Sequence, residues 1–324
     1  MRIPATTLLF FATLVSSAQT TSGTLSFALP EHPGKLSLNK GAFQITEFSA
    51  KPNGLAWGIR AEDHDLHLLG SLFVWPENPY LTAEVCRDEM LRKEGPVSEQ
   101  AAMNRIQLRS SSGVDIALAL MLPKDGKSSA VRAFVASGDL CGDLTFSSPH
   151  PVAEQAVPMQ KVKDILLTLK FDPEVQPTFR DAMAYATIEF NHHQYAGAAT
   201  TYQAALKLVD TSDDPLKWRR VITDQLSMSL GISGNLAQSR AVNEAAIAHD
   251  PTYPLYYYNL ACADAEQGNA SAARVHLQQA FDRRANVLPG ESIPDPTKDD
   301  SILKLKSDPT FWAFAQSLAA PGKP

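Results

Sequence analysis

Two patterns of hydrophobic and polar residues divide the chain near residue 171. Between residues 35 and 171, short stretches alternate between hydrophobic and polar positions, which is typical of half-buried β-strands. The strands predicted in this way are 41–50, 55–60, 66–74, 114–121 and 131–144, the last with a turn near Gly138. Two stretches, 79–93 and 157–169, have helical spacing instead. The pattern predicts an α+β domain over 35–171, an antiparallel sheet with helices.

From about residue 179 onward, alanine-rich segments carry hydrophobic residues three and four positions apart, the spacing of one helix face. Gly234 and Asn235 recur 34 residues later as Gly268 and Asn269, and Ala246 recurs as Ala280 at the same interval. A fixed interval of this length indicates a repeated helix–turn–helix unit. The glycines are expected to adopt the left-handed backbone that ends a helix.

These segments resemble tetratricopeptide repeats. The resemblance covers three units over residues 172–285, the first with a longer connection at 210–215, and implies an all-α solenoid. It is carried by tyrosines, leucines and small residues at matching positions, namely Tyr195, Ala198, Tyr202, Ala205, Ser239, Ala246, Tyr257, Leu260, Ala261, Ala273, Leu277 and Ala280. Residues 286–298, with three prolines, are predicted to form a loop, and residues 299–320 to form the helices that cap the array.

The resemblance also implies a binding surface, because the first helix of each unit lines a groove in this family. By position, the groove residues are Met183, Thr187, Phe190, Asn191, Asp224, Met228, Tyr258, Asn259 and Cys262. Asn259 stands where some members grip a peptide backbone, but the lysines and arginines of the carboxylate-gripping subgroup are missing. A protein or peptide partner is therefore expected. The alternative is that these residues pack against the N-terminal domain and the groove is filled.

The first eighteen residues have the pattern of a signal peptide. Arg2 precedes an apolar run over 7–15, and Ser16 and Ala18 supply small residues before a cleavage point. The alternative is a membrane anchor, but the run is shorter than the about 20 residues that span a bilayer. We expect an exported chain, periplasmic or secreted, with a flexible linker over 19–34 and no membrane span in the mature protein.

Three cysteines are present, which leaves one over if two of them pair. Cys86 and Cys141 both lie in the N-terminal half, so an oxidising compartment permits a disulfide between them. The alternative is two buried thiols that never meet. Cys262 is expected to be the free thiol.

Short stretches of the N-terminal half resemble uncharacterised bacterial domains similar to the PsbP-like fold. The strings are residues 85–88 and 139–147, followed by a helix and Leu169-Lys170-Phe171. The resemblance implies an antiparallel sheet with helices on both faces and a scaffold or binding role.

Composition and local motifs do not point to chemistry. The net charge of −6 gives no electrostatic footprint for nucleic acid. On a strand, His64 and His67 would face opposite sides and would not converge on a metal, so a solvated polar turn is expected there instead. Ser301 and Lys304 match the Ser-x-x-Lys string of penicillin-recognising enzymes, without the other motifs. We expect a non-catalytic protein with no cofactor or metal. The alternative is a small-ligand-binding or enzymatic N-terminal domain, with the repeats as an accessory.

Overall fold

The structure, a computed structural model, describes residues 23–51, 56–76, 82–95, 102–121, 129–149 and 156–319. The predicted signal peptide, residues 1–18, lies outside the described residues. The described chain divides into two compact units, one ending at His192 and the other beginning at His193. We call them the sheet unit and the helical unit.

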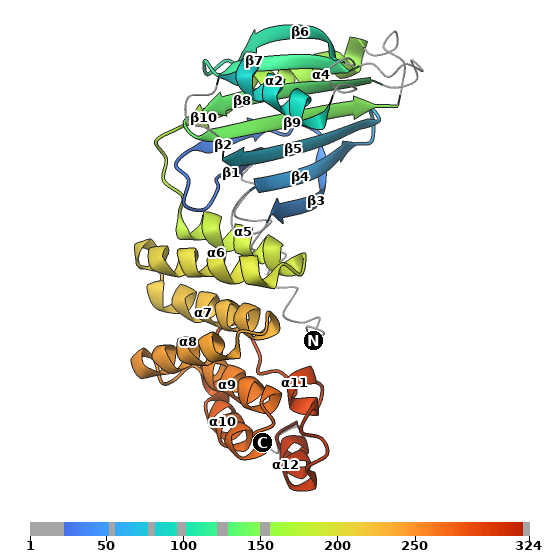
Figure 1. Cartoon of the computed structure of the whole chain (residues 1–324). Helices are drawn as coiled ribbons and strands as arrows, with labels where there is room; N and C mark the ends of the chain where they lie inside the picture. The colour runs from blue at the N-terminus through green and yellow to red at the C-terminus, as the bar shows by residue number, and fades with distance from the viewer. Residues whose placement is uncertain are drawn as a thin grey trace. The chain divides into compact units, whose positions relative to one another are not determined.

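The sheet unit is built on a seven-stranded antiparallel sheet in the order β3-β4-β5-β9-β8-β7-β6 (Figure 1). Its strands are β3 (Gln44–Lys51), β4 (Ala56–Asp63), β5 (Leu68–Pro76), β6 (Ala102–Arg109), β7 (Asp115–Met121), β8 (Ser129–Ser137) and β9 (Leu140–Ser148). A second, three-stranded sheet has the order β1-β2-β10, with β1 (Thr24–Phe27), β2 (Lys35–Asn39) and β10 (Lys170–Asp172). The predicted α+β class, an antiparallel sheet with helices, is confirmed.

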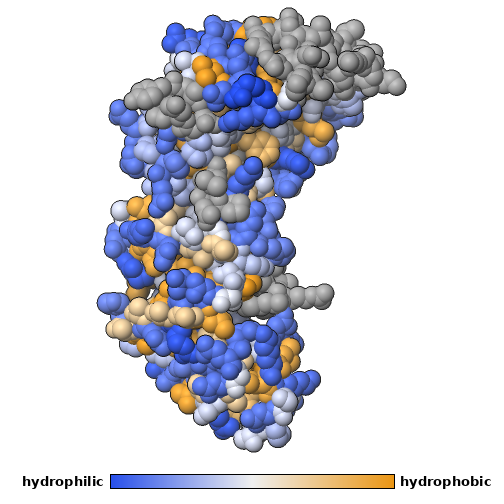
Figure 2. Space-filling model, in the orientation of Figure 1, coloured by the Kyte–Doolittle hydropathy of each residue, from blue (hydrophilic) through white to orange (hydrophobic). Residues whose placement is uncertain are grey.

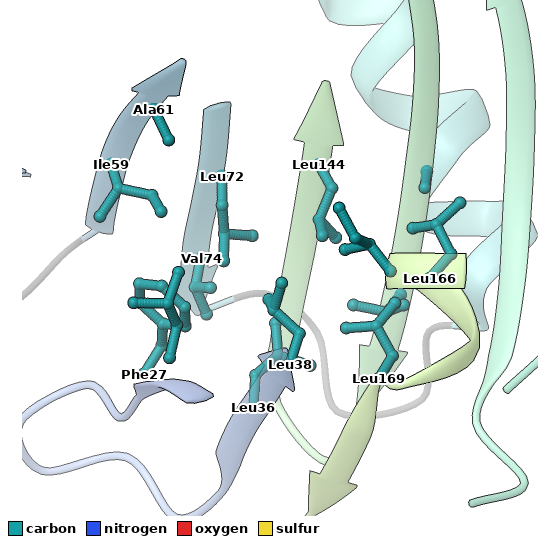
Figure 3. Close-up of a cluster of buried hydrophobic side chains, with 14 of the residues drawn as sticks. Phe27, Leu36, Leu38, Ile59, Ala61, Leu72, Val74, Leu144, Leu166 and Leu169 are labelled. Atoms are coloured by element: carbon teal, nitrogen blue, oxygen red, sulfur yellow. The ribbon is translucent and has the colours of Figure 1, made fainter. Parts of the chain in front are cut away.

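The main core lies where one face of the large sheet meets the small sheet and helix α4 (Ala156–Leu167). In β5 the alternation is clear, since Leu72 and Val74 are buried whereas Leu69 and Phe73 are exposed on the other face. Figure 3 shows how side chains from separate elements meet in this core: Phe27, Leu36, Leu38, Ile59, Ala61, Leu72, Val74, Leu144, Leu166 and Leu169. This burial is the main driving force for the unit.

Helix α2 (Ala83–Glu94) covers the opposite face of the large sheet, over β7, β8 and β9. A disulfide joins Cys86 of this helix to Cys141 of β9, with the two Cα atoms 6.2 Å apart. At the end of the helix, the Glu94 carboxylate accepts two hydrogen bonds from Arg132 of β8, at 2.7 and 2.9 Å. Arg132 also donates to Asp143 of β9 at 2.5 Å. A covalent bond and an ion group therefore fix α2 to the sheet.

Helix α5 (Phe179–Asn191) belongs to the sheet unit. It begins with a capping box, in which the Thr178 and Asp181 side chains each accept a hydrogen bond from the other's backbone N–H. The Tyr185 hydroxyl donates to the Lys51 carbonyl of β3 at 2.7 Å and accepts from the Ala56 N–H at 3.0 Å. These bonds pin α5 to the strand edge.

Two boundaries differ from the sequence prediction. The predicted start of the repeats at residue 172 lies before α5, but α5 is part of the sheet unit because Tyr185 and Ile188 enter the sheet's core. The predicted linker 19–34 contains strand β1, and Leu25, Phe27 and Leu29 are buried. Strand β6 was not predicted either.

The helical unit is a stack of antiparallel helix pairs (Figure 1). Its helices are α6 (Tyr195–Leu208), α7 (Pro215–Ile232), α8 (Leu236–His249), α9 (Pro254–Glu266), α10 (Ala270–Asp282), α11 (Asp300–Leu303) and α12 (Pro309–Ala319), with short 3-10 turns at η3 (Val209–Thr211) and η4 (Arg284–Asn286). Together they form the predicted all-α helical-repeat solenoid.

The repeated turns between paired helices have the expected conformation. Gly234 and Gly268 have φ angles of 88° and 73°, which a residue with a side chain rarely adopts. The next residue caps the following helix in both turns: the Asn235 and Asn269 side chains accept hydrogen bonds from Gln238 N and Ala272 N, at 3.4 and 3.1 Å. The 34-residue period is thus visible in backbone angles and in caps.

Small residues allow α9 and α10 to approach closely. Ala261 of α9 and Ala273, Leu277 and Ala280 of α10 are fully buried and share one cluster. The same cluster takes in residues of the closing helices, Ile302, Phe311 and Ala315. The C-terminal helices therefore cover the end of the array, as a terminal repeat requires.

Candidate partner-binding surface

Helices α7 and α9 lie against each other and are the first helices of their pairs. Each starts in a way that fixes its position along the chain. Asp214 caps α7 by accepting a hydrogen bond from Lys217 N at 3.1 Å, and Pro215 and Pro254 occupy the first turns of α7 and α9. Four predicted groove residues lie on one stretch of these helices: Asp224, Tyr258, Asn259 and Cys262. We call it the α7–α9 face.

A hydrogen bond across the two helices is the centre of this face. The Asn259 amide of α9 donates to the Asp224 carboxylate of α7 at 2.8 Å, and the Gln225 amide lies 3.4 Å from the other oxygen. Asp224 is 7% exposed. The pKa of Asp224 is raised to about 7, chiefly by burial and also by the nearby charge of Glu291, while the hydrogen bonds from Asn259 and Gln225 act in the opposite direction. The structure therefore buries a carboxyl group against amides.

Glu291 reaches this face from the loop that follows α10. Its carboxylate accepts a hydrogen bond from the Tyr253 hydroxyl at 2.8 Å and from the Leu288 N–H at 3.1 Å. Burial raises the pKa of Glu291, whereas these hydrogen bonds and the charges of Arg220 and Lys217 lower it. Arg220 is itself held by the Asp250 carboxylate, at 2.7 and 3.0 Å.

Asp299 marks a second point of contact between the loop and α9. Its carboxylate caps α11 by accepting from Ser301 N at 2.9 Å and Ile302 N at 3.3 Å. The Cys262 thiol lies 3.8 Å from the same oxygen. Burial raises the pKa of Asp299 and that of the Cys262 thiol. Tyr258, 3% exposed, packs in the cluster that holds Ile302 and Leu305.

These contacts succeed one another along α9 from its start to its end. Helix α11 lies beside α9 (Figure 1). The Asn286 amide donates to the Thr252 carbonyl just before the helix begins, at 3.1 Å. Glu291 then meets Tyr253, Asp299 meets Cys262, and Lys304 pairs with Glu266 at the last turn. Residues 286–304 therefore run the length of α9. We call residues 287–299, which lie between η4 and α11, the covering segment.

Of the remaining predicted groove residues, those of α5 are not gathered on this face. Met183, Thr187 and Phe190 are buried in α5 of the sheet unit, where the Thr187 hydroxyl donates to the Met183 carbonyl at 2.8 Å. Asn191, at the end of α5, is exposed. Met228 of α7 lies one helical turn after Asp224, at the edge of the α7–α9 face, and is half-buried, with its sulfur 4.0 Å from the Gln225 amide nitrogen.

Sequence reasoning placed Asp224 and Asn259 by repeat register but missed the residues that complete the face. Glu291 and Asp299 lie in the region predicted to be a loop and the start of a cap. A local pattern could have marked the segment, since Leu288 and Ile293 are each followed by a proline. It could not have shown that the segment lies on α9.

The surface of the helical unit is mixed in character. Figure 2 shows orange, hydrophobic patches between blue, hydrophilic residues on the visible face of this unit. Two large hydrophobic side chains of the unit are exposed: Leu216 of α7 at 54% and Val275 of α10 at 53%. A partner that binds such a surface needs both polar and apolar groups.

A ligand site or active site in the sheet unit was the alternative predicted from the sequence. A shallow, open pocket lies beside α4, lined by Ser111, Ser112, Asp164, Leu167, Thr168 and Lys170. Within the described ranges, no three His, Cys, Asp or Glu side chains are grouped to hold a metal ion. No helix in those ranges is long and apolar enough to cross a membrane.

Comparisons with known proteins give limited similarity. No protein-family model matches the sequence. No curated protein sequence matches it.

Solved structures with partial similarity include the Sgt2 tetratricopeptide-repeat domain from Aspergillus fumigatus, at 15% identity and a TM-score of 0.32 over 46% of this chain and 88% of that chain. A Bacteroides thetaiotaomicron protein has 9% identity and a TM-score of 0.32, over 61% of this chain and 78% of that chain. A multi-domain immunophilin from Arabidopsis thaliana has 13% identity and a TM-score of 0.26, over 81% of this chain and 98% of that chain.

The description of the helical unit as tetratricopeptide-like rests on its own geometry, the 34-residue period with its matching turns and caps. The resemblance of the N-terminal half to PsbP-like domains stays a prediction.

Proposed function

We propose that this chain is an exported, non-catalytic protein that binds a segment of another protein on the α7–α9 face of its helical unit. The observation that carries the proposal is the covering segment itself. A piece of chain without regular helix or strand already lies along α9 from Tyr253 to Cys262, held by polar contacts and by apolar packing at the start of the helix. A face that accepts one such segment has the polar groups and the apolar surface to accept another.

Export is supported by the residue pattern at the start of the chain and by the disulfide. Structural disulfides persist mainly in oxidising compartments, such as the periplasm or the outside of the cell. The bond between Cys86 and Cys141 has both sulfurs in buried residues, 2% and 1% exposed. A periplasmic or secreted location therefore goes with this proposal.

Site-specific photocrosslinking tests the binding proposal. A benzophenone amino acid replaces Met228 on α7 in the full chain, expressed in the native host and irradiated in intact cells. The matched control carries the same amino acid at Val275 of α10, an exposed residue outside the α7–α9 face. We expect an adduct with a specific protein at position 228 and not at position 275.

The same adducts at both positions, or none at position 228, would contradict the proposal. Fractionation of the host for the mature chain tests the location separately. Recovery of the chain in the cytoplasm with its N-terminal residues intact would contradict export and leave the binding proposal in place.

A further inference from the structure

The covering segment lies on α9, where a bound partner segment would lie, and has apolar and acidic side chains directed at that helix. Residues 287–299 contain no regular helix or strand, whereas α9 beside them is a continuous helix. Their apolar side chains, Leu288 and Ile293, pack against Tyr253, Leu255 and Tyr256 at the start of α9. Proline at 289, 294 and 296 keeps the segment out of helix and sheet and lowers the entropy lost when it is ordered.

Polar contacts hold the segment at few points. Glu291 accepts from the Tyr253 hydroxyl, and Asp299 lies near the Cys262 thiol. Among the charged groups near Glu291, Arg220 and Lys217 of α7 attract its carboxylate, while Asp224 of α7 repels it. Attraction and repulsion therefore act on the same side chain.

From these contacts we propose that the covering segment is an autoinhibitory occupant of the α7–α9 face, which a partner displaces with a segment of the same chemistry. That segment has no regular helix or strand and contains proline, with two branched apolar residues five positions apart and a carboxylate between them. The inference rests on the function proposed above and adds the class of partner and the means of control. In the resting protein the face is closed, and binding requires that residues 287–299 leave α9.

Competition within the chain sets the expected behaviour. A tethered segment has an effective concentration of about a millimolar at its site, so a free segment of equal intrinsic affinity binds poorly until the tethered one is weakened. Weakening it raises the apparent affinity for the free segment, and locking it abolishes binding. A permanent cap shows neither response.

The probe is a fluorescent synthetic peptide with the sequence of residues 286–300, and binding is measured by anisotropy with the full mature chain. The open variant is Leu288→Ser with Ile293→Ser, which alters the covering segment and leaves α7 and α9 unchanged. Its matched control is Leu216→Ser with Val275→Ser, two exposed apolar residues at 54% and 53%. We expect the open variant to bind the probe at least tenfold more tightly than the wild type and the control do.

The locked variant is Asp299→Cys, which places a second thiol beside Cys262, whose sulfur lies 3.8 Å from an Asp299 oxygen. Oxidation with copper phenanthroline joins the two residues. The matched control, Asp299→Cys with Cys262→Ser, cannot form the bond. We expect the oxidised locked variant to bind no probe, while its control binds at least as well as the wild type.

Equal probe affinity in the folded open variant and the wild type would overturn the proposal. If the open variant fails to fold, hydrogen exchange in the wild type decides. Exchange in residues 287–299 that is as slow as in α9, and unchanged by locking, identifies a permanent cap.

The two proposals fail separately. An adduct at position 228 without probe binding would contradict only the autoinhibition proposal. Probe binding without any adduct would contradict the proposal of an external partner and would mean that the face binds only its own chain.

Discussion

Two buried aspartates, one in each compact unit, have different surroundings. Asp143 of the sheet unit is 5% exposed and lies 2.5 Å from the Arg132 guanidinium, which also binds Glu94. Asp224 of the helical unit is 7% exposed and meets two amides and the field of a second carboxylate. The first carboxyl group has a cation to offset its burial, whereas the second does not.

The difference distinguishes the fixed contact around Asp143 from the contact between Asp224 and the covering segment, which we propose to be exchangeable. Arg132, Asp143 and Glu94 join two strands and a helix that are also joined by a disulfide, so this group stabilises a single arrangement. Asp224 faces a segment of chain whose Glu291 adds like charge to the site. Two carboxyl groups that are buried close together disfavour each other's charged form, so this contact holds its segment less firmly than the Arg132 group holds α2.

The largest expected effect comes from removing the cation in the sheet unit. Arg132→Met leaves Asp143 buried without its partner, and we expect the free energy of unfolding to fall by about 3–5 kcal/mol. Native-state hydrogen exchange in β8 and β9 measures the loss within that unit.

Two matched variants define the cause. Arg109→Met breaks an exposed pair with Asp115, with both side chains more than 70% exposed, and should cost at most about 1 kcal/mol. Arg132→Met with Asp143→Leu should recover part of the loss. A loss in Arg132→Met no larger than that in Arg109→Met would show that the buried pair does not stabilise the sheet unit.

The disulfide gives the next largest effect. Cys86→Ala with Cys141→Ala should lower the free energy of unfolding of the sheet unit by about 2–4 kcal/mol, because the bond closes a loop with a sequence separation of 55. Hydrogen exchange in α2 and β9 measures it. Cys262→Ala, in the helical unit, should leave exchange in α2 and β9 unchanged. If Cys262→Ala slowed or sped exchange in α2 and β9 as much as the loss of the disulfide does, the two units would not be independent in stability.

The sequence determined the repeat positions better than the sheet or the covering segment. Gly234, Asn235 and their counterparts 34 residues later specify turns and caps through local chemistry, so periodicity alone located them. Strand β1 was not predicted because its two core residues, Leu25 and Phe27, are too few to establish an alternation. Its partner strand β2 supplies the burial that its own pattern does not.

For the candidate surface, the limit was distance along the chain. Asp224 and Asn259 were placed by register in neighbouring units, and they do form a hydrogen bond. Glu291 meets Tyr253 across 38 residues, and no repeat relates a loop to a helix. The position of α5 was also beyond the pattern, because Tyr185 fits both a repeat helix and a contact with strand backbone.

The smallest expected effect tests Asp224 directly, and it should be a gain. The pKa of Asp224 is raised from 3.8 to about 7, so the folded protein keeps a proton that the unfolded chain loses. Stability that depends on this group is therefore complete below about pH 4 and is lost as the pH rises to about 7. Asp224→Asn removes the loss, because its amide oxygen can still accept from Asn259.

The variant and the wild type should have similar stability near pH 4, and the variant should be more stable by about 1–3 kcal/mol above pH 7. Hydrogen exchange in α7 and α9, measured across this range, resolves the difference. Asp210→Asn, at a side chain that is 77% exposed and pairs with Arg219, should change stability by less than about 1 kcal/mol at every pH. A pH-independent difference for Asp224→Asn would mean that Asp224 is ionised at low pH, like an exposed acid. The contrast with Asp143 would then lie in packing rather than in charge.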